Sequence, residues 1–115
     1  MTETRTTEDV LDHHTQSFMD GNIDELVSDY TEESIMFTSN GPVRGLKQLR
    51  TFFETFLNSV PDTFVADYKI MRKDIDGEVA YTLWRSGTFT PMGTDTFIVR
   101  DGKFIIQSTA AYVPG

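Results

Sequence analysis

The chain has 115 residues, of which 38% are hydrophobic and 12% aromatic, and it contains no cysteine. This length predicts a single domain with one hydrophobic core, and the missing cysteine excludes disulfides and cysteine-ligated metals. The net charge of −8 at pH 7 argues against nucleic acid as a partner, because an acidic domain repels phosphate.

The negative charge is concentrated in residues 1–33, which hold ten acidic residues and one basic residue. A solvated helical face is the favoured interpretation, and a docking surface for a basic partner is the alternative. The N-terminus lacks the apolar core of a signal peptide, and no apolar run is long enough to span a bilayer. We therefore expect a cytoplasmic protein that binds no membrane, folded as one domain over residues 1–115 with residues 1–5 disordered.

Three helices are predicted in the N-terminal half. Thr6 or Thr7 can cap the first of them, and acidic residues in its first turn suit the helix dipole. The third has the strongest apolar stripe at helical spacing. The expected elements are, in chain order, a helix ending near Asp20, a short helix over about 24–30, a strand at 34–38, a turn or small hairpin at 39–45, and a helix over 46–60.

The apolar period changes to two in the C-terminal half, which predicts four strands joined by short turns. Gly87 is a natural site for a bend, and Asp101-Gly102 predicts a tight turn resembling type I′. Helices followed by strands indicate an α+β fold, in which a curved antiparallel sheet wraps the three N-terminal helices as a cone with a pocket at its wide end. The expected strands are residues 63–73, 78–90, 94–100 and 103–113, with turns at 74–77 and 91–93.

The segment FMDGNIDELVSDYTEESIMFTSNGPVRGLKQLRTFFETF, residues 18–56, resembles the opening of the nuclear transport factor 2-like superfamily. The shared features are Gly-Asn-Ile-Asp at 21–24, Tyr30 with two acids shortly after it, a strand, a glycine turn, and Arg44-Gly45 before an amphipathic helix. Residues 99–113 are similar too, and the match covers roughly residues 8–113. It implies a single SnoaL-like domain with a cystatin-like α+β barrel, in the branch that includes ketosteroid isomerase and the SnoaL-type polyketide cyclases.

The resemblance can be carried over to three catalytic positions. Ketosteroid isomerase uses a tyrosine, an aspartate base and an aspartic acid, and the corresponding positions here are His14, Thr38 and Asp95. A threonine hydroxyl cannot take a proton from carbon unaided. We therefore predict that the protein is not a ketosteroid isomerase of the known mechanism.

Two residues are the candidate catalytic groups. Asp95 shares a strand face with Phe97 and Val99, so it either faces the pocket as an acid or base or caps the turn at 91–93. His14 lies on the apolar side of the first helix, as a core histidine or as a partner of Asp95 in the pocket. The candidate binding residues, which are first of all core residues, are Phe18, Thr38, Phe56, Phe97 and Tyr112.

Two functions remain open from the sequence. One is a cofactor-free enzyme of isomerase, cyclase or hydrolase type that acts on a small apolar molecule; the other is a non-catalytic ligand-binding or dimerisation module. We expect no metal, because Asp9, Asp12 and His13 lack a further ligand nearby. A homodimer is predicted through the outer sheet face, with Trp84 and Ile98 as anchors, and ordinary packing of Trp84 under a loop is the alternative.

Overall fold

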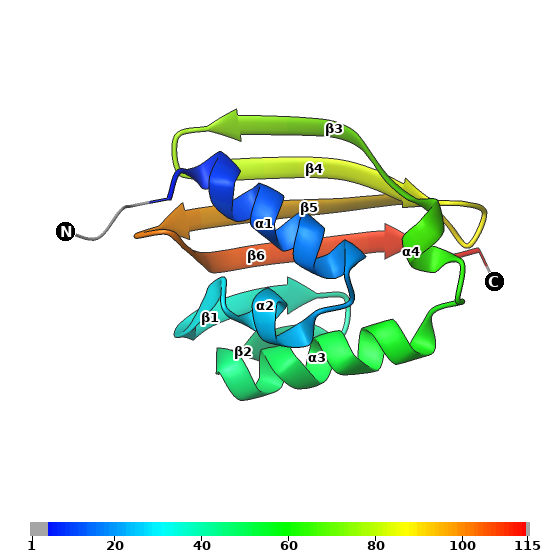
Figure 1. Cartoon of the computed structure of the whole chain (residues 1–115), viewed down its shortest axis with the longest axis horizontal. Helices are drawn as coiled ribbons and strands as arrows, with labels where there is room; N and C mark the ends of the chain where they lie inside the picture. Colours follow the sequence, from blue (N-terminus) through cyan, green and yellow to red (C-terminus); the bar gives the residue numbers. More distant parts are fainter. Residues whose placement is uncertain (1–4, 115) are drawn as a thin grey trace.

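The computed structural model describes residues 5–114, which form helices and one curved sheet (Figure 1). The described helices are α1 (Thr7–Met19), α2 (Ile23–Val27), α3 (Gly45–Ser59) and α4 (Phe64–Asp67). The described strands are β1 (Tyr30–Thr38), β2 (Gly41–Arg44), β3 (Tyr68–Asp76), β4 (Val79–Ser86), β5 (Thr90–Arg100) and β6 (Lys103–Tyr112). The predicted α+β class is confirmed.

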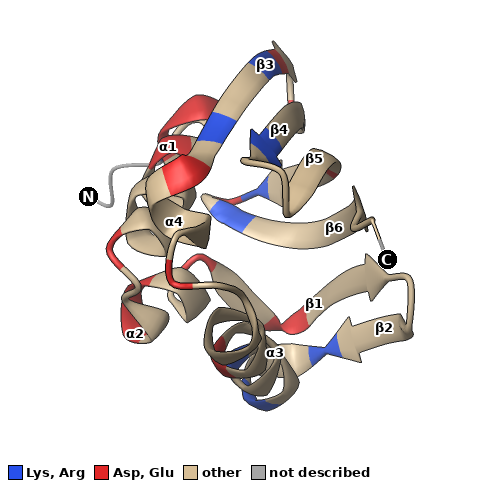
Figure 2. Ribbon diagram, turned by 90° about the vertical axis from the view of Figure 1, so that its right-hand side faces the viewer, with Lys and Arg blue, Asp and Glu red and all other residues tan. Residues whose placement is uncertain are grey.

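The sheet has the strand order β2-β1-β6-β5-β4-β3 and curves around the helices, as the side view in Figure 2 shows. It is not closed, because β2 and β3 are its two ends. The predicted antiparallel meander runs from β3 to β6. One pair departs from the prediction: β1 lies parallel to β6. No hairpin joins these two strands, because α3, α4 and the other strands lie between them in the chain. The sheet is therefore mixed.

Three local predictions in the C-terminal half were wrong. The turn expected at 74–77 lies at 77–78, because residues 74–76 continue β3. Residues 64–67, expected in a strand, form the short helix α4. The turn expected at 91–93 lies instead at 87–89, where Gly87 supplies a backbone φ of 54°, and Gly93 pairs within the sheet with Trp84. A tight turn needs the positive φ that glycine adopts easily, so Gly87 forms the turn itself and not a bend within a strand.

The turn at Asp101-Gly102 is confirmed. Both residues have positive φ, at 53° and 75°, as a type I′ turn requires.

The start of α1 agrees with the capping prediction. Thr6 Oγ1 accepts a hydrogen bond from the Asp9 backbone at 3.0 Å, and Asp9 Oδ2 accepts one from the Thr6 backbone at 3.0 Å. Residues 1–4, expected to be disordered, lie outside the described residues. Arg5 was included in that expectation, yet it donates to Asp29 Oδ1 at 2.9 Å and to the Gly102 carbonyl at 2.6 Å. The N-terminal end of α1 is thereby tied to the β5–β6 turn.

The hydrophobic core fills the part of the domain near the β5–β6 turn. Phe97 and Phe104 stack there with ring centroids 4.6 Å apart, and both are almost fully buried. Leu11 of α1 and Leu49 of α3 close the core from the helical side. Toward the other end of β6 the core gives way to a cavity. No helix within residues 5–114 is long and apolar enough to cross a membrane.

Candidate functional site

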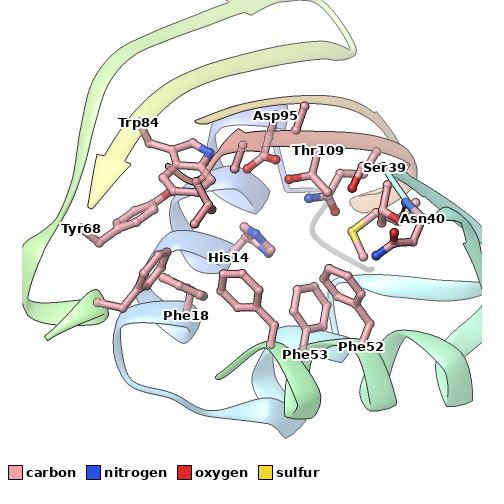
Figure 3. Close-up of a pocket in the computed structure, with 18 of the residues that line it drawn as sticks. His14, Phe18, Ser39, Asn40, Phe52, Phe53, Tyr68, Trp84, Asp95 and Thr109 are labelled. Atoms are coloured by element: carbon pink, nitrogen blue, oxygen red, sulfur yellow. Dashed lines mark hydrogen bonds between the residues drawn. The ribbon is translucent and has the colours of Figure 1, made fainter. Parts of the chain in front are cut away.

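A pocket of about 300 Å³ lies between the helices and the inner face of the sheet (Figure 3). Exposed residues at its rim include Asn40 of the β1–β2 hairpin and Val113 after β6. Aromatic side chains dominate the walls, and a smaller polar group lies on the sheet side. The lining residues include Phe18, Phe52, Phe53, Phe56, Phe64, Tyr68 and Trp84 among the aromatics, and His14, Thr38, Asp95, Gln107 and Thr109 among the polar ones.

Helix α3 supplies one aromatic wall. Its spacing of three and four residues places Phe52, Phe53 and Phe56 on or beside one face, and Phe52 stacks on Phe56 with an angle of 13° between the rings. Phe18 of α1 continues this wall, with its ring centroid 6.2 Å from that of Phe56. The helical half of the pocket is therefore a continuous aromatic surface.

Asp95 of β5 lies on the inner sheet face, between its cross-strand partners Thr82 and Thr109. Its Oδ1 is buried and makes no hydrogen bond to the described residues. Burial raises the pKa of Asp95 from 3.8 to about 6, and hydrogen bonding by the side chains of Thr109 and Trp84 acts against that rise, although neither completes a hydrogen bond to Oδ1. Because residues 91–93 belong to β5 and form no turn, the alternative of a turn cap does not hold.

Trp84 lies on the inner face, contrary to the prediction that it lies on the outer one. Its side chain is 6% exposed and lines the pocket. Alternation along β4 correctly groups it with Ala80 and Thr82, but it does not reveal which face the helices cover. Ile98 is half-buried on the outer face, so the predicted homodimer would have to form without Trp84 as an anchor.

The Trp84 indole crosses the sheet directly over Gly93. A Cβ at position 93 would lie 2.3 Å from the indole Cζ2, far inside van der Waals contact. Only glycine leaves room for the ring, and the ring is held on its other sides by Tyr68 and Phe64, at centroid distances of 5.3 and 6.1 Å. Gly93 therefore sets the position of Trp84 in the pocket wall.

We expect Gly93→Ala to displace the indole toward the cavity and to lower the free energy of unfolding by about 1–3 kcal/mol, as overpacked cores do. Trp84 is the single tryptophan, so its fluorescence maximum should change together with the urea midpoint. Gly77→Ala is a useful comparison, because a Cβ there meets nothing within 4 Å although its φ of 58° brings strain. A Gly93→Ala protein with an unchanged tryptophan spectrum would contradict this assignment.

His14 lines the pocket and is enclosed by four aromatic rings. The centroids of Tyr30, Phe53, Phe97 and Phe104 lie 5.2–6.2 Å from its own. Its Nδ1 is buried without a hydrogen-bond partner among the described residues. Burial lowers the pKa of His14 to about 4, although the charge of Asp29 acts in the other direction. The imidazole is therefore neutral at pH 7.

His14 and Asp95 line the same pocket, but no hydrogen bond joins them. The two side chains therefore share one cavity without forming the direct pair considered from the sequence.

The hydroxyl of Thr38, at the position of the isomerase base, is occupied by the β1–β2 hairpin. It donates to the Gly41 carbonyl at 2.8 Å and accepts from the Asn40 backbone at 3.1 Å. Thr38 therefore lines the pocket without a hydroxyl proton free for a ligand.

The remaining candidate binding residues divide into two groups. Phe18 and Phe56 line the pocket. Phe97 does not, because it is 1% exposed and lies beneath His14. Tyr112 does not either: it is 63% exposed, and the inward position on β6 belongs to its neighbour Ala111.

Sequence reasoning missed several polar lining residues, among them Tyr68, Gln107 and Thr109. Burial and the charge of Asp95 raise the pKa of Tyr68 above its ordinary value. Gln107 accepts a hydrogen bond from the Tyr30 hydroxyl through its Oε1. Simple alternation does not mark Gln107, because the β-bulge between Phe104 and Ile106 changes which residues of β6 face inward.

His13 was left without a role by the sequence, and the structure places it in an ion cluster on the side of α1 away from the pocket. Its Nδ1 is 2.7 Å from Asp29 Oδ2, and its Nε2 is 2.8 Å from Glu25 Oε1. Within residues 5–114, no group of three or more His, Asp or Glu side chains is placed to hold a metal ion.

No protein-family model and no curated protein matches the chain significantly, whereas solved structures do. A SnoaL-like protein of unknown function from Burkholderia thailandensis superposes with a TM-score of 0.77 at 12% identity, over 92% of this chain and 94% of that one. A nuclear transport factor 2-like protein of unknown function from Burkholderia xenovorans reaches 0.75 at 17%, over 95% and 84%. A protein from Sinorhizobium meliloti, provisionally named a polyketide cyclase, reaches 0.74 at 13%, over 89% and 94%.

The chain has the nuclear transport factor 2-like fold. The resemblance drawn from residues 18–56 is thus confirmed at the level of the fold. At these identities the likeness extends no further than the fold, and one such scaffold carries many activities. The activity of this nuclear transport factor 2-like domain must therefore be argued from its pocket.

Proposed function

We propose that this nuclear transport factor 2-like domain is a SnoaL-like protein that binds a small, largely apolar molecule in its pocket and exchanges a proton with it through Asp95. The observation that carries the proposal is the unpartnered Oδ1 of Asp95 in an otherwise aromatic cavity. A buried polar atom without a partner is unfavourable, so a ligand group that bonds to it gains affinity. The volume of about 300 Å³ suits a molecule of two fused rings.

The chemistry follows from the two titratable side chains. A carboxyl with a pKa of about 6 has both protonation states accessible near neutral pH, which is what an acid or base catalyst needs. The neutral imidazole of His14 can orient the ligand's polar group or pass on a proton. Isomerisation or ring closure by proton transfer, without a cofactor, is the reaction class that these groups support.

A second candidate function is ligand binding without catalysis. It is favoured by the hydrogen bonds that occupy the Thr38 hydroxyl, and by the lack of a second carboxylate among the lining residues. With one carboxyl group alone, proton removal and return both fall to Asp95.

The test combines binding and turnover. Trp84 lines the pocket and is the only tryptophan, so its fluorescence reports the entry of bicyclic aromatic ketones, alcohols and amines. Bound compounds are then followed by proton NMR for deuterium exchange or isomerisation. We expect Asp95→Asn to reduce turnover by roughly 100-fold or more, with exposed Asp76→Asn as the control for loss of one charge.

The outcomes separate the two functions. Turnover that survives both Asp95→Asn and His14→Ala would eliminate the catalytic form and leave the binding form. Failure of the whole panel to alter Trp84 fluorescence or the melting temperature would eliminate both.

A further inference from the structure

The pocket contains polar atoms without hydrogen-bond partners and one carboxyl group without a positively charged partner. Three buried side-chain atoms among the described residues make no hydrogen bond, and they are His14 Nδ1, Trp84 Nε1 and Asp95 Oδ1. Of these residues, only Asp95 becomes negatively charged. The pocket lining contains no lysine and no arginine, so an ionised Asp95 has no positive side chain in the cavity to pair with.

Aromatic rings lie around the part of the cavity that Asp95 faces. The Tyr68 and Trp84 centroids are 5.3 Å apart, and Phe18 lies 5.0 Å from Tyr68. Figure 3 shows Trp84 and Tyr68 on the sheet side with Asp95, and Phe18 opposite. The faces of such rings attract cations, and most strongly where water is excluded.

We propose that the ligand of this pocket carries a basic nitrogen, with its ammonium group on Asp95 beside the rings of Trp84 and Tyr68 and its apolar framework against the phenylalanines of α3. This inference rests on the proposed function and narrows its ligand class. An ammonium supplies the missing counter-charge and donates to the free carboxylate oxygen, and charge-assisted bonds of this kind are the strong ones. The net charge of −8 also raises the local concentration of cations.

The competing ligand is neutral and carries a carbonyl oxygen. It could accept from Trp84 Nε1 and from Asp95, but from Asp95 only while that carboxyl is protonated. The two ligands therefore predict opposite effects of pH. Binding of an amine strengthens as pH rises through about 6, the pKa of Asp95, and binding of a ketone weakens.

The other titratable groups around the pocket do not obscure this difference. His14 on α1 has a pKa of about 4 and stays neutral above it. Tyr68 on β3 and Tyr30 on β1 have pKa values raised above their ordinary value by burial. Asp95 is thus the pocket group that changes charge between about pH 5 and pH 8.

Three compounds on one bicyclic framework test the proposal. They are the aliphatic amine 2-aminotetralin, the alcohol 2-tetralol and the ketone 2-tetralone. Affinities are measured by calorimetry from about pH 5 to pH 8, on the wild type, Asp95→Asn and the exposed control Asp76→Asn. At the upper pH we expect aminotetralin to bind roughly 10-fold or more tighter than tetralol. Asp95→Asn should abolish that preference, Asp76→Asn should keep it, and the preference should shrink below about pH 6.

Each contrary result has its own meaning. If tetralone or tetralol binds at least as tightly as the amine at the upper pH, or if the amine preference survives Asp95→Asn, the basic-nitrogen inference is overturned while the proposed pocket function stands. If none of the three compounds binds to the folded wild type, the basic-nitrogen inference is overturned, and the proposed function is overturned as well only if the whole fluorescence panel also fails to bind. Circular dichroism at each pH verifies that every variant is folded.

Discussion

Asp95→Asn is expected to stabilise the ligand-free protein by about 3 kcal/mol at about pH 8, and by less than about 1 kcal/mol at about pH 4. Burial raises the pKa of this carboxyl from 3.8 to about 6. The folded state therefore holds the proton more tightly than the unfolded state does. The stability that the protonated Asp95 contributes to the fold is fully present below about pH 3.8 and is lost as pH rises through about 6. At high pH the wild type is therefore less stable than Asp95→Asn.

Urea unfolding of both proteins at the two pH values measures this effect. The pH dependence that His14 gives to the free energy of unfolding has the opposite sign. Its pKa is lowered to about 4, so the stability that the neutral imidazole contributes is lost as pH falls through that value. It is present in both proteins, so most of its contribution cancels in the difference. Exposed Asp76→Asn should show no comparable gain. An equal effect of Asp95→Asn at both pH values would show that Asp95 is solvated, and the acid and base role would lose its physical basis.

Asp29→Asn is expected to destabilise the protein by about 3 kcal/mol, at the lower end of the effect of breaking a buried ion pair. Asp29 is fully buried. It accepts from Arg5 Nη1 at 2.9 Å and contacts His13 Nδ1 at 2.7 Å. An asparagine keeps the shape but loses the charge and one acceptor. The expected value is at the lower end because Arg5 and His13 remain about a third exposed and can be solvated.

The same cluster predicts a dependence on pH. The hydrogen bond to Asp29 is the main cause that raises the pKa of His13 above 6.5, and Glu25 adds to it. A raised histidine pKa stabilises the fold fully below about 6.5, and this stability is lost as pH rises through the higher folded value. We therefore expect the melting-temperature difference between wild type and Asp29→Asn to shrink as pH rises through the raised pKa of His13.

Glu25→Gln provides the matched control, because Glu25 contacts the same imidazole but is more than half exposed. Exposed pairs contribute little, so this variant should lose less than about 1 kcal/mol. Equal losses in Glu25→Gln and Asp29→Asn would mean that burial of Asp29 adds nothing to the cluster.

Local patterns in the sequence predicted the start of α1 and the β5–β6 turn well, because both depend on near neighbours. Thr6 and Asp9 cap α1 through atoms three residues apart, and the Asp101-Gly102 turn follows from positive φ at adjacent residues. The failures occurred where distant contacts decide. Residues 64–67 form a helix because Phe64 is buried under the sheet against Phe18, Phe56 and Trp84, which no local period records.

The candidate site shows the same division. Alternation along β5 placed Asp95 on the side of Phe97 and Val99, and that grouping is what the structure has. Alternation along β4 likewise grouped Trp84 with Ala80 and Thr82, but this group was predicted on the outer face of the sheet and lies on the inner face. The expectation that Tyr112 lines the pocket was not met, because a β-bulge in the β5–β6 pairing interrupts the period of two along β6 and because Tyr112 lies at the end of the strand.

The sequence by itself determined the α+β class, because capping and periodicity are properties of neighbours along the chain. Through a resemblance in the order of its motifs, it also predicted the nuclear transport factor 2-like fold and offered His14 and Asp95 as candidate site residues. Only the tertiary structure decided that Trp84 lies inside, over Gly93. It also decided that Asp95 faces an aromatic cavity without a counter-charge. These facts depend on which sheet face the helices cover, and that choice is made by packing between residues far apart in the chain.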